Sequence, residues 1–324
     1  MDLFLNIIYL IGSLALILFG ANWLTDGGSG VAKRFGLSEM VIGLTIVAFG
    51  TSAPELVIST VSAIKGNAGI AVGNIVGSNI ANILLIIGTV AAIRPIVIQR
   101  TVMNNEIPLV ILASVALLAC GNSMLLDGTP NIVSRVDGIM LLLFFAIFMR
   151  YTIAQAKTSS EPATDAAPGS GKPSGFWKSV GLIVIGLGAL IFGGDVFVDS
   201  ASAIASRFGV SDAVIGLTVV ALGTSLPELA TSAVAAVKGH PGLAVGNVIG
   251  SCLFNILFIL GLDALIRPLP FGTIGNVDLL TMSGAALLFW ICGWFVGRRT
   301  ITRGEGFLMA ACYAAYIIYL VVNA

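Results

Sequence analysis

Two stretches of this chain, GLTIVAFGTSAPE at residues 43–55 and GLTVVALGTSLPE at residues 216–228, are near copies with ten of thirteen positions identical. They lie 173 residues apart, and the same offset relates GIAVGNIVGSNIAN at 69–82 to GLAVGNVIGSCLFN at 242–255. Each copy places one glutamate, Glu55 or Glu228, directly after a proline in an otherwise apolar stretch. Acids in hydrocarbon that are related by an internal duplication indicate an ion site at the interface between two repeats.

The composition is that of a membrane protein. Hydrophobic residues make up 57% of the 324 residues and charged residues only 10%. Apolar runs of about 18 residues or more recur along the chain, which is typical of membrane-spanning helices. We predict an all-α membrane protein with ten transmembrane helices, at residues 4–24, 39–63, 69–92, 105–122, 134–153, 176–199, 212–236, 242–266, 277–297 and 304–322.

Several classes of function are disfavoured by the same sequence. The formal net charge is +0, whereas a nucleic-acid partner would need a basic surface. No G-x-x-x-x-G-K-[ST] motif is present, which argues against a nucleotide partner and an ATP-driven pump. The four cysteines show neither metal-site nor disulfide spacing, and we expect no permanently bound cofactor.

The loop charges predict the orientation of the chain. With the N-terminus outside, twelve of the sixteen lysines and arginines fall on inward loops, so the positive-inside rule places both termini outside the cytoplasm. Five helices per copy is an odd number, so the second copy must be inverted in the membrane. We therefore divide the chain into a first five-helix repeat at 1–153, a flexible cytoplasmic linker at 154–175 and a second, inverted repeat at 176–324.

The repeated glutamate motif predicts a broken helix. Pro54 lacks an N–H and its ring collides with the carbonyl of Gly50, so the helix should bend or unwind over 48–54 and free carbonyls from Ala48 to Thr51. Bare carbonyls at membrane depth need a partner, and a bound cation is one. Thr51 and Glu55 share a helix face, with Ser52 alongside. The second copy repeats this set with Ala221, Thr224, Ser225 and Glu228.

The helices that follow each motif supply an opposing wall. Asn74, Ser78 and Asn82 are four residues apart and form one polar line. A second line of glycines at 69, 73 and 77 should let helices approach closely. Both lines recur in the second copy, as Asn247, Ser251 and Asn255, and as glycines 242, 246 and 250.

These side chains together form an all-oxygen donor set. Such a set suits Ca²⁺, which takes six to eight oxygens, and by the same hardness Na⁺, whereas zinc and copper prefer nitrogen or sulfur. Two glutamates neutralise one Ca²⁺, and an empty site with two bare carboxylates would be costly, which couples exit of one ion to entry of another.

Some residues leave two interpretations open. Asn74 and Asn247 suit interhelical hydrogen bonding as well as cation ligation. Asp26 and Asp199 lie near predicted helix ends in glycine-rich sequence, where they could cap a helix or line an ion pathway. His240 lies in a loop beside Pro241, and we expect it to take no part in transport.

The duplicated motifs resemble the two α-repeats of the cation/Ca²⁺ exchanger superfamily, in particular its prokaryotic sodium/calcium exchangers. The resemblance is specific over the four motif helices, and the 5+5 plan extends it to the whole chain. It implies Ca²⁺ bound between Glu55 and Glu228, Na⁺ at neighbouring positions, and helices 1 and 6 that slide outside the core bundle. The cation ligands that it implies are Ala48, Thr51, Ser52, Glu55, Ser78, Asn82, Ala221, Thr224, Ser225, Glu228, Ser251 and Asn255. Some relatives, including potassium-dependent ones, carry Asp where this chain has Asn255, so potassium dependence is not expected here.

We therefore predict a secondary antiporter that exchanges Na⁺ for Ca²⁺ by alternating access. The nearest alternative is a Ca²⁺/H⁺ antiporter using the same two glutamates. A channel-like pore is disfavoured by the broken-helix repeats, and a membrane enzyme by the lack of a nucleophile–base set. The remaining expectations are a monomer in the prokaryotic inner (plasma) membrane whose partners are Ca²⁺, Na⁺ and the lipid bilayer.

Overall fold

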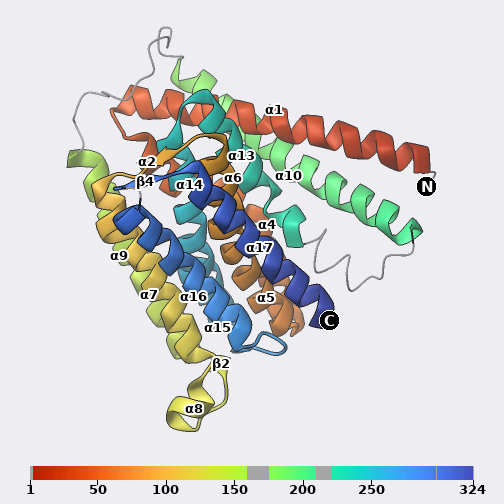
Figure 1. Cartoon of the computed structure of the whole chain (residues 1–324), viewed down its shortest axis with the longest axis vertical. Helices are drawn as coiled ribbons and strands as arrows, with labels where there is room; N and C mark the ends of the chain where they lie inside the picture. The colour runs from red at the N-terminus through yellow and green to blue at the C-terminus, as the bar shows by residue number, and fades with distance from the viewer. Residues whose placement is uncertain (1–2, 159–174, 209–220, 297, 324) are drawn as a thin grey trace.

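The computed structural model of the chain describes residues 3–158, 175–208, 221–296 and 298–323, and it is built almost entirely of helices (Figure 1). In the first half the helical elements are α1 (Leu3–Phe35), α2 (Glu39–Ile42), η1 (Gly43–Val47), α3 (Ala48–Thr51), α4 (Ala53–Lys65), α5 (Ala68–Ile80), η2 (Ala81–Ile87), α6 (Gly88–Ile93), η3 (Val102–Glu106), α7 (Ile107–Cys120), α8 (Ser123–Asp127) and α9 (Arg135–Thr158). In the second half they are α10 (Phe176–Arg207), α12 (Ala221–Thr224), α13 (Leu226–Lys238), α14 (Pro241–Leu253), η5 (Phe254–Ile259), α15 (Leu260–Ile266), α16 (Asn276–Ile291), η6 (Cys292–Val296) and α17 (Arg303–Asn323). The elements labelled η are π-helical turns within longer helices.

The predicted spans correspond to the observed helices wherever the structure describes them. Among the described residues, eight helices are long and apolar enough to cross a membrane, and the pair Glu39–Thr51 and Ala53–Lys65, bent by 49°, makes a ninth if it is one span. The predicted helix at 212–236 lies partly outside the described residues, which resume at α12 and α13. The chain is therefore a helical multi-pass membrane protein.

Three predicted boundaries are wrong. Helix α1 continues to Phe35 rather than ending at residue 24, and α10 continues to Arg207 rather than 199. Helix α9 reaches Thr158, so the first residues of the predicted linker at 154–175 are helical, and the linker residues 159–174 lie outside the described part of the chain. Gly27 and Gly28 suggest a turn in isolation, but they lie against other helices and stay helical.

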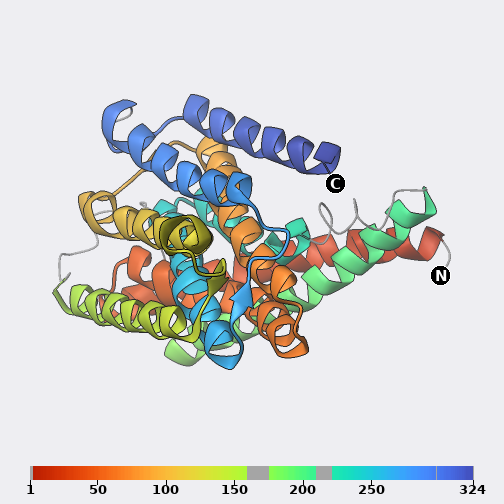
Figure 2. The same cartoon turned by 90° about the horizontal axis from the view of Figure 1, so that it is seen from below.

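Helices α1 and α10 form a closely packed pair. A Cβ on Gly20 would lie 2.9 Å from the carbonyl oxygen of Gly186, and a Cβ on Gly186 would lie 2.7 Å from the backbone nitrogen of Leu24. Figures 1 and 2 show the two helices side by side, with the end that carries the N-terminus projecting beyond the remaining helices. Glycines thus bring the two backbones into direct contact over several turns.

The centre of the molecule is formed by the helices that follow the two motifs. Of the most apolar window in the span Pro241–Ile266, 94% is buried inside the protein, and for Ala68–Ile93 the share is 78%. The corresponding share is only 22% for α1, α9 and α17, which lie at the periphery (Figure 2). The predicted polar lines are therefore carried by the most deeply buried helices.

Two short antiparallel strand pairs join the halves. Strand β1 (Ile96–Val97) pairs with β4 (Thr300–Ile301), with Ile96 opposite Ile301. Strand β2 (Ile132–Val133) pairs with β3 (Leu269–Pro270), with Val133 opposite Leu269. Each pair links a connection in the first half to one in the second.

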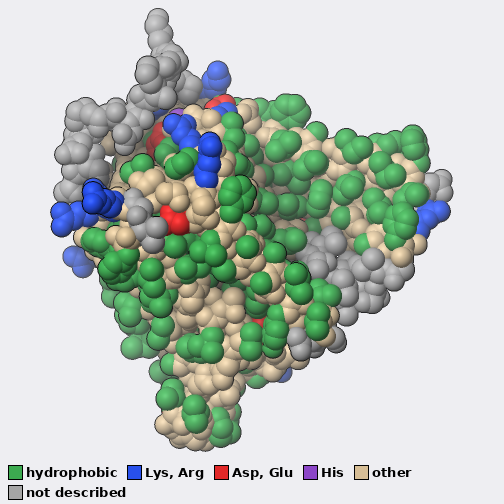
Figure 3. Space-filling view, viewed as in Figure 1, with side chains coloured by type: hydrophobic (Ala, Val, Ile, Leu, Met, Phe, Trp, Pro, Cys, Tyr) green, Lys and Arg blue, Asp and Glu red, His purple; other side chains and the backbone are tan. Residues whose placement is uncertain are grey.

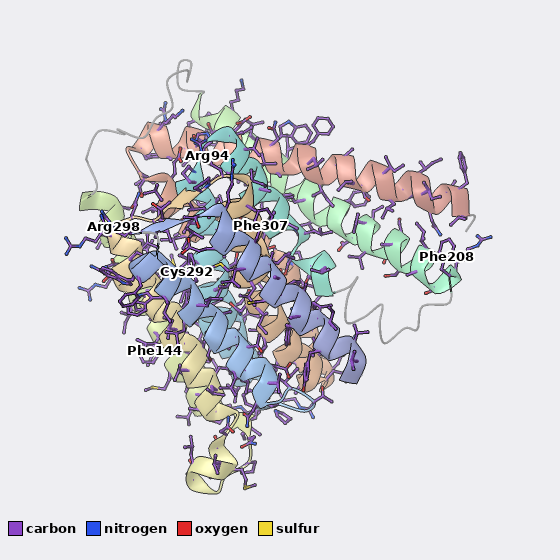
Figure 4. All side chains as sticks on the ribbon, viewed as in Figure 1. Arg94, Phe144, Phe208, Cys292, Arg298 and Phe307 are labelled. Carbon is purple, nitrogen blue, oxygen red and sulfur yellow. The ribbon has the colours of Figure 1, made fainter. Side chains whose placement is uncertain are left out.

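The outer surface is apolar where lipid is expected. Large side chains such as Phe144 and Phe307 are 49% and 65% exposed, and Figure 4 shows them on the outward faces of peripheral helices. Hydrophobic side chains are spread widely over the face seen in Figure 3, while most lysines and arginines visible there lie toward one end of the molecule. This distribution fits a protein surrounded by hydrocarbon with charged ends.

Candidate cation-binding site

The repeated glutamate motif forms the same break in both halves. Ser52 separates α3 from α4 with φ −84° and ψ 11°, and Ser225 separates α12 from α13 with φ −88° and ψ 4°. Each break is followed by a proline in the first turn of the next helix, where a missing N–H is tolerated. The predicted bend at 48–54 is confirmed, and its angle is 49°.

The carbonyl of Ala48 is not freed by this bend, contrary to prediction. It accepts the backbone N–H of Ser52 at 2.9 Å and the hydroxyl of Thr51 at 3.3 Å. The helix therefore bends without unwinding at this residue, because the proline removes an N–H one turn further on.

Backbone contact between glycines brings the motif of the first half against α14. A Cβ on Gly43 would lie 2.6 Å from the carbonyl oxygen of Leu243, and a Cβ on Gly246 would lie 2.6 Å from that of Met40. Gly250 meets Leu44 and Ala48 as closely. The predicted close approach is thus confirmed for this copy, while residues 212–220, which would be the counterpart partners of the other glycine line, lie outside the described residues.

The two predicted acids and the polar side chains around them are buried together. Glu55 and Glu228 are each 1% exposed, close enough to repel each other. None of the ten predicted side-chain ligands is more than 8% exposed: Thr51, Ser52, Glu55, Ser78, Asn82, Thr224, Ser225, Glu228, Ser251 and Asn255. Such burial of two acids requires compensation by protons or cations.

Hydroxyl groups from both halves surround the Glu228 carboxylate. Ser52 donates to Glu228 Oε1 at 2.8 Å, and Ser251 donates to the same oxygen at 3.5 Å. Ser52 belongs to the first motif and Glu228 to the second, so this bond crosses between the halves. The site is therefore shared rather than duplicated.

The Glu55 carboxylate has a looser set of donors. Ser78 donates to Glu55 Oε1 at 3.4 Å, and Ser225 of the second half donates to Ser78 at 3.4 Å. Thr224 of the second half also hydrogen-bonds Glu55. Both acids thus contact the break in the opposite half.

Several oxygens at this place have no hydrogen-bond partner. Among the described residues, Oε2 of Glu55, Oε2 of Glu228 and the side-chain oxygens of Asn82 and Asn255 are buried without one. Buried polar atoms are nearly always satisfied in folded proteins, so a group of unsatisfied oxygens calls for a ligand. A dehydrated cation supplies what carboxylate and amide oxygens lack.

The oxygen ligands gathered here suit a hard cation. In the described part of the chain, no three or more His, Cys, Asp or Glu side chains are grouped so that they could hold a metal ion. The polar atoms gathered here are carboxylate, hydroxyl and amide oxygens. Such donors suit Ca²⁺ and Na⁺, whereas zinc and copper favour nitrogen and sulfur.

The two asparagines for which the sequence left two interpretations open form hydrogen bonds to the neighbouring motif helix. Asn74 donates to the carbonyl oxygen of Glu55 at 3.3 Å and to the hydroxyl of Ser59 at 2.9 Å. Asn247 repeats this with the carbonyl oxygen of Glu228 at 3.4 Å and Ser232 at 3.0 Å.

Asn247 also accepts a hydrogen bond from Thr51 at 3.0 Å, across the halves. Its side-chain oxygen is therefore already occupied. The geometry favours interhelical positioning over ligation for these two asparagines.

Two groups outside the motif make contacts between distant segments of the chain. Asp26 lies within α1 rather than in a turn, and it forms an ion pair with Lys238 at 2.5 Å. His240 contacts Glu39 at 2.6 Å, which ties the start of α14 to the start of α2. Neither contact could be read from sequence spacing, because the partners are about 200 positions apart.

Sequence reasoning missed a buried acid on one of the predicted polar lines. Asp263 in α15 is 0% exposed, and its Oδ1 accepts the hydroxyl of Thr60 at 2.7 Å. It continues the polar line of Asn247, Ser251 and Asn255 by two further turns. Asp263 could have been noticed as an acid inside the apolar run 242–266. A comparison of the two repeats does not reveal it, because the equivalent position in the first half is Val90.

Comparison with known proteins supports the same assignment over both halves. The sequence model of the family described as "Sodium/calcium exchanger protein" matches residues 5–154 and 178–322. The chain is 34% identical over 330 residues to the inner membrane protein YrbG of Escherichia coli, covering 96% of this chain and 95% of YrbG. It is 31% identical over 348 residues to the sodium/calcium exchanger MaX1 of Methanosarcina acetivorans, covering 97% and 98%.

A solved structure has the same fold. The chain superimposes on the sodium-calcium exchanger NCX_Mj with a TM-score of 0.82 and 32% identity, over 97% of this chain and 98% of that one. That structure was obtained in a study of extracellular ion exchange and of induced occlusion of the binding site. The chain therefore belongs to the sodium/calcium exchanger family, whose members are transporters rather than enzymes.

Proposed function

We propose that this protein is a secondary antiporter that exchanges Na⁺ for Ca²⁺ by alternating access, with the ions bound between the two repeats. One observation carries the proposal: two buried glutamates from equivalent positions face a shared set of oxygen donors, and each leaves one carboxylate oxygen unpartnered among the described residues. The named activities of MaX1 and NCX_Mj support the choice of ions.

The proposed ligands are the twelve residues predicted from sequence. Glu55 and Glu228 would neutralise Ca²⁺, and the hydroxyl and amide side chains would complete the shell, with carbonyls of Ala48 and Ala221. The Ala48 carbonyl can reach a cation once the Thr51 hydroxyl, which now donates to it, turns away. The ten side-chain ligands are Thr51, Ser52, Glu55, Ser78, Asn82, Thr224, Ser225, Glu228, Ser251 and Asn255.

Charge balance explains why exchange would be coupled. A loaded site with one Ca²⁺ and two carboxylates is neutral, and Na⁺ ions in the same donors also reduce its charge. An empty site would carry two bare carboxylates through low dielectric, which is costly. The carrier would therefore reorient only when loaded, which makes it an antiporter rather than a leak.

The proposed topology is ten transmembrane helices in two inverted repeats, at 1–153 and 176–324, joined by a linker. Both termini would lie outside the cytoplasm of a prokaryotic inner (plasma) membrane, with the protein active as a monomer. Lysines and arginines, Arg94 and Arg298 among them, gather at the end of the molecule where α9 ends and α10 begins (Figures 3 and 4). Basic residues mark the cytoplasmic side, so this distribution supports the orientation.

A transport assay separates Na⁺ from H⁺ as the counter-ion. Purified protein is reconstituted into liposomes, and ⁴⁵Ca²⁺ uptake is driven by an outward Na⁺ gradient or, separately, by an outward-directed proton gradient. We expect uptake with the Na⁺ gradient alone, abolished when Na⁺ is replaced by choline. Uptake with the proton gradient in Na⁺-free buffer would instead identify a Ca²⁺/H⁺ antiporter.

A further inference from the structure

We propose that two Asp–Lys pairs, related by the internal repeat, act as alternating latches on opposite faces of the membrane. The first latch is Asp26–Lys238, which is formed in this structure, and the second latch is Asp199–Lys65, which forms when the carrier faces the other way. This proposal rests on the alternating access proposed above.

The sequence supplies the same four charges twice. Lys65 is the last residue of α4 and Lys238 is the last residue of α13, 173 positions later. Asp26 in α1 and Asp199 in α10 are separated by the same 173 positions. Each repeat therefore contributes one lysine at the end of a motif helix and one aspartate on a peripheral helix.

The structure uses only one of the two pairs. Lys238 Nζ lies 2.5 Å from Asp26 Oδ1 and 3.3 Å from the carbonyl oxygen of Asn22, which joins α13 to α1. Lys65 and Asp199 are both exposed and make no ion pair within the described residues. Of two Asp–Lys pairs related by the repeat, one is thus formed and the other is open in the same molecule.

The packing of α1 against α10 places the two aspartates on a single unit. Gly20 contacts Gly186, and further along, Gly193 lies against Ser13 and Ile17. The helices run in opposite directions, so Asp26 and Asp199 lie about 25 Å apart along the pair, at 1.5 Å per residue.

The two ends of this unit have different surroundings. The end of α1 near Asp26 packs on α13, while the end of α10 that carries Phe208 projects from the bundle (Figures 1 and 4). A shift of the whole unit can therefore separate one pair while it brings the other together.

Exchange of the two latches follows from the inverted repeat. In such proteins the two halves swap conformations when access switches sides. The environment of Lys238 would pass to Lys65, and that of Asp26 to Asp199.

One Asp–Lys contact is lost and one is gained, so the two latches together leave the two states nearly balanced. An exposed pair contributes up to about 1 kcal/mol, so removing one latch should shift the balance between the two states by up to about fivefold. Each latch therefore stabilises one direction of access without locking it.

The proposed topology assigns a side to each latch. Lys238 and the end of α1 lie on the predicted cytoplasmic side, so the formed latch closes the inner face. Lys65 and Asp199 lie on the predicted outer side, where the open latch leaves access. A static surface ion pair, by contrast, would persist whichever way the site faces.

Cysteine pairs test the alternation in the full-length protein in liposomes. Asp26→Cys with Lys238→Cys reports the first latch, and Lys65→Cys with Asp199→Cys reports the second. The four native cysteines are buried or half-buried and are retained, with each single variant as a control for cross-links to them. Cross-linking is followed with a short bifunctional thiol reagent during Na⁺-driven Ca²⁺ exchange.

We expect both pairs to cross-link during turnover, and each cross-link to arrest exchange. Adding Asp26→Asn to the Lys65→Cys/Asp199→Cys protein should raise its cross-linking rate up to about fivefold. Asp127→Asn, a matched change at an exposed carboxylate at the end of α8, should leave the rate unchanged.

The latches are overturned if the second pair never cross-links in protein that exchanges ions, or if Asp26→Asn has no effect. If the unmodified protein moves no Ca²⁺ under a Na⁺ gradient, the proposed function fails instead. The two failures are therefore distinguishable in the same preparation.

Discussion

The two repeats carry nearly the same motif but hold their acids differently. Glu228 accepts Ser52 of the opposite repeat at 2.8 Å, whereas Glu55 accepts Ser78 at 3.4 Å, and Ser78 in turn accepts Ser225. Lys238 has an aspartate partner and its counterpart Lys65 has none among the described residues. The repeated sequence thus sets the chemistry of one site, while the fold adopts an asymmetric state around it, which is what the proposed alternating access requires.

Removing either acid tests what the repeats share, and it should have the largest effect. Loss of one of two buried charges that neutralise a cation costs about 3–5 kcal/mol, or about 100-fold or more in affinity. Glu55→Gln and Glu228→Gln should each abolish measurable Na⁺-driven Ca²⁺ uptake. Glu106→Gln, which changes a buried glutamate outside the site, should retain it. Uptake that survives in one of the two site variants would show that the repeats do not share a site.

The two serines at the helix breaks test where the repeats differ. Ser52 donates a short hydrogen bond to a carboxylate, and such bonds are worth about 1.5–3 kcal/mol, against about 0.5–1.5 kcal/mol for a neutral pair such as Ser225 and Ser78. Ser52→Ala should weaken Ca²⁺ binding by about 10-fold or more, and Ser225→Ala by less than about 10-fold. Isothermal titration of both variants makes the comparison, and equal losses would contradict the asymmetry described here.

Asn74 and Asn247 differ by one hydrogen bond. Asn247 makes three hydrogen bonds, including one to Thr51, whereas two are found for Asn74 in the described part of the chain. At about 1 kcal/mol per bond, Asn247→Leu should destabilise the protein by about 3 kcal/mol and Asn74→Leu by about 2 kcal/mol. Thermal unfolding in detergent measures both, and a larger loss for Asn74→Leu would refute the added inter-repeat bond.

Asp263, the acid of the second repeat that has no counterpart in the first, gives the smallest expected effect. Asp263→Val installs the residue that the first repeat has at position 90, and it removes a buried carboxylate with one unpartnered oxygen among the described residues. Valine avoids the cost of burying the acid, which offsets the loss of the hydrogen bond from the half-buried Thr60, so stability should change by less than about 1 kcal/mol and exchange should persist. Thr60→Val, which instead leaves the Asp263 carboxylate without its hydrogen-bond donor, should destabilise the protein by about 1–3 kcal/mol. Lost exchange in Asp263→Val with unchanged folding would give this acid a transport role.

Much of the site could be predicted because its donors are repeated. Glu55 and Glu228 stand out as acids in apolar runs, and the four-residue spacing of Ser78 with Asn82 puts them on one face. The proline also predicted the bend at Ser52. Local rules were sufficient here because side-chain type and helical period determine which groups face each other.

The rest depended on packing between distant segments. Gly27 looks like a turn residue, yet α1 stays helical past it because that side lies against Ser179 and Ile183 of α10. Asp263 has no repeat counterpart, so the comparison that revealed the site could not reveal it. The unequal bonding of Glu55 and Glu228 is a property of one conformation, and a symmetric sequence motif cannot encode which conformation is adopted.

The number of Ca²⁺ ions bound per chain tests the shared site most directly. Equilibrium ⁴⁵Ca²⁺ binding to purified protein, with and without Na⁺, should give one ion per chain that Na⁺ displaces competitively. Glu55→Gln and Glu228→Gln should each remove that single ion entirely. Two ions per chain, with each variant losing only one of them, would show that every repeat has its own site and would contradict the account.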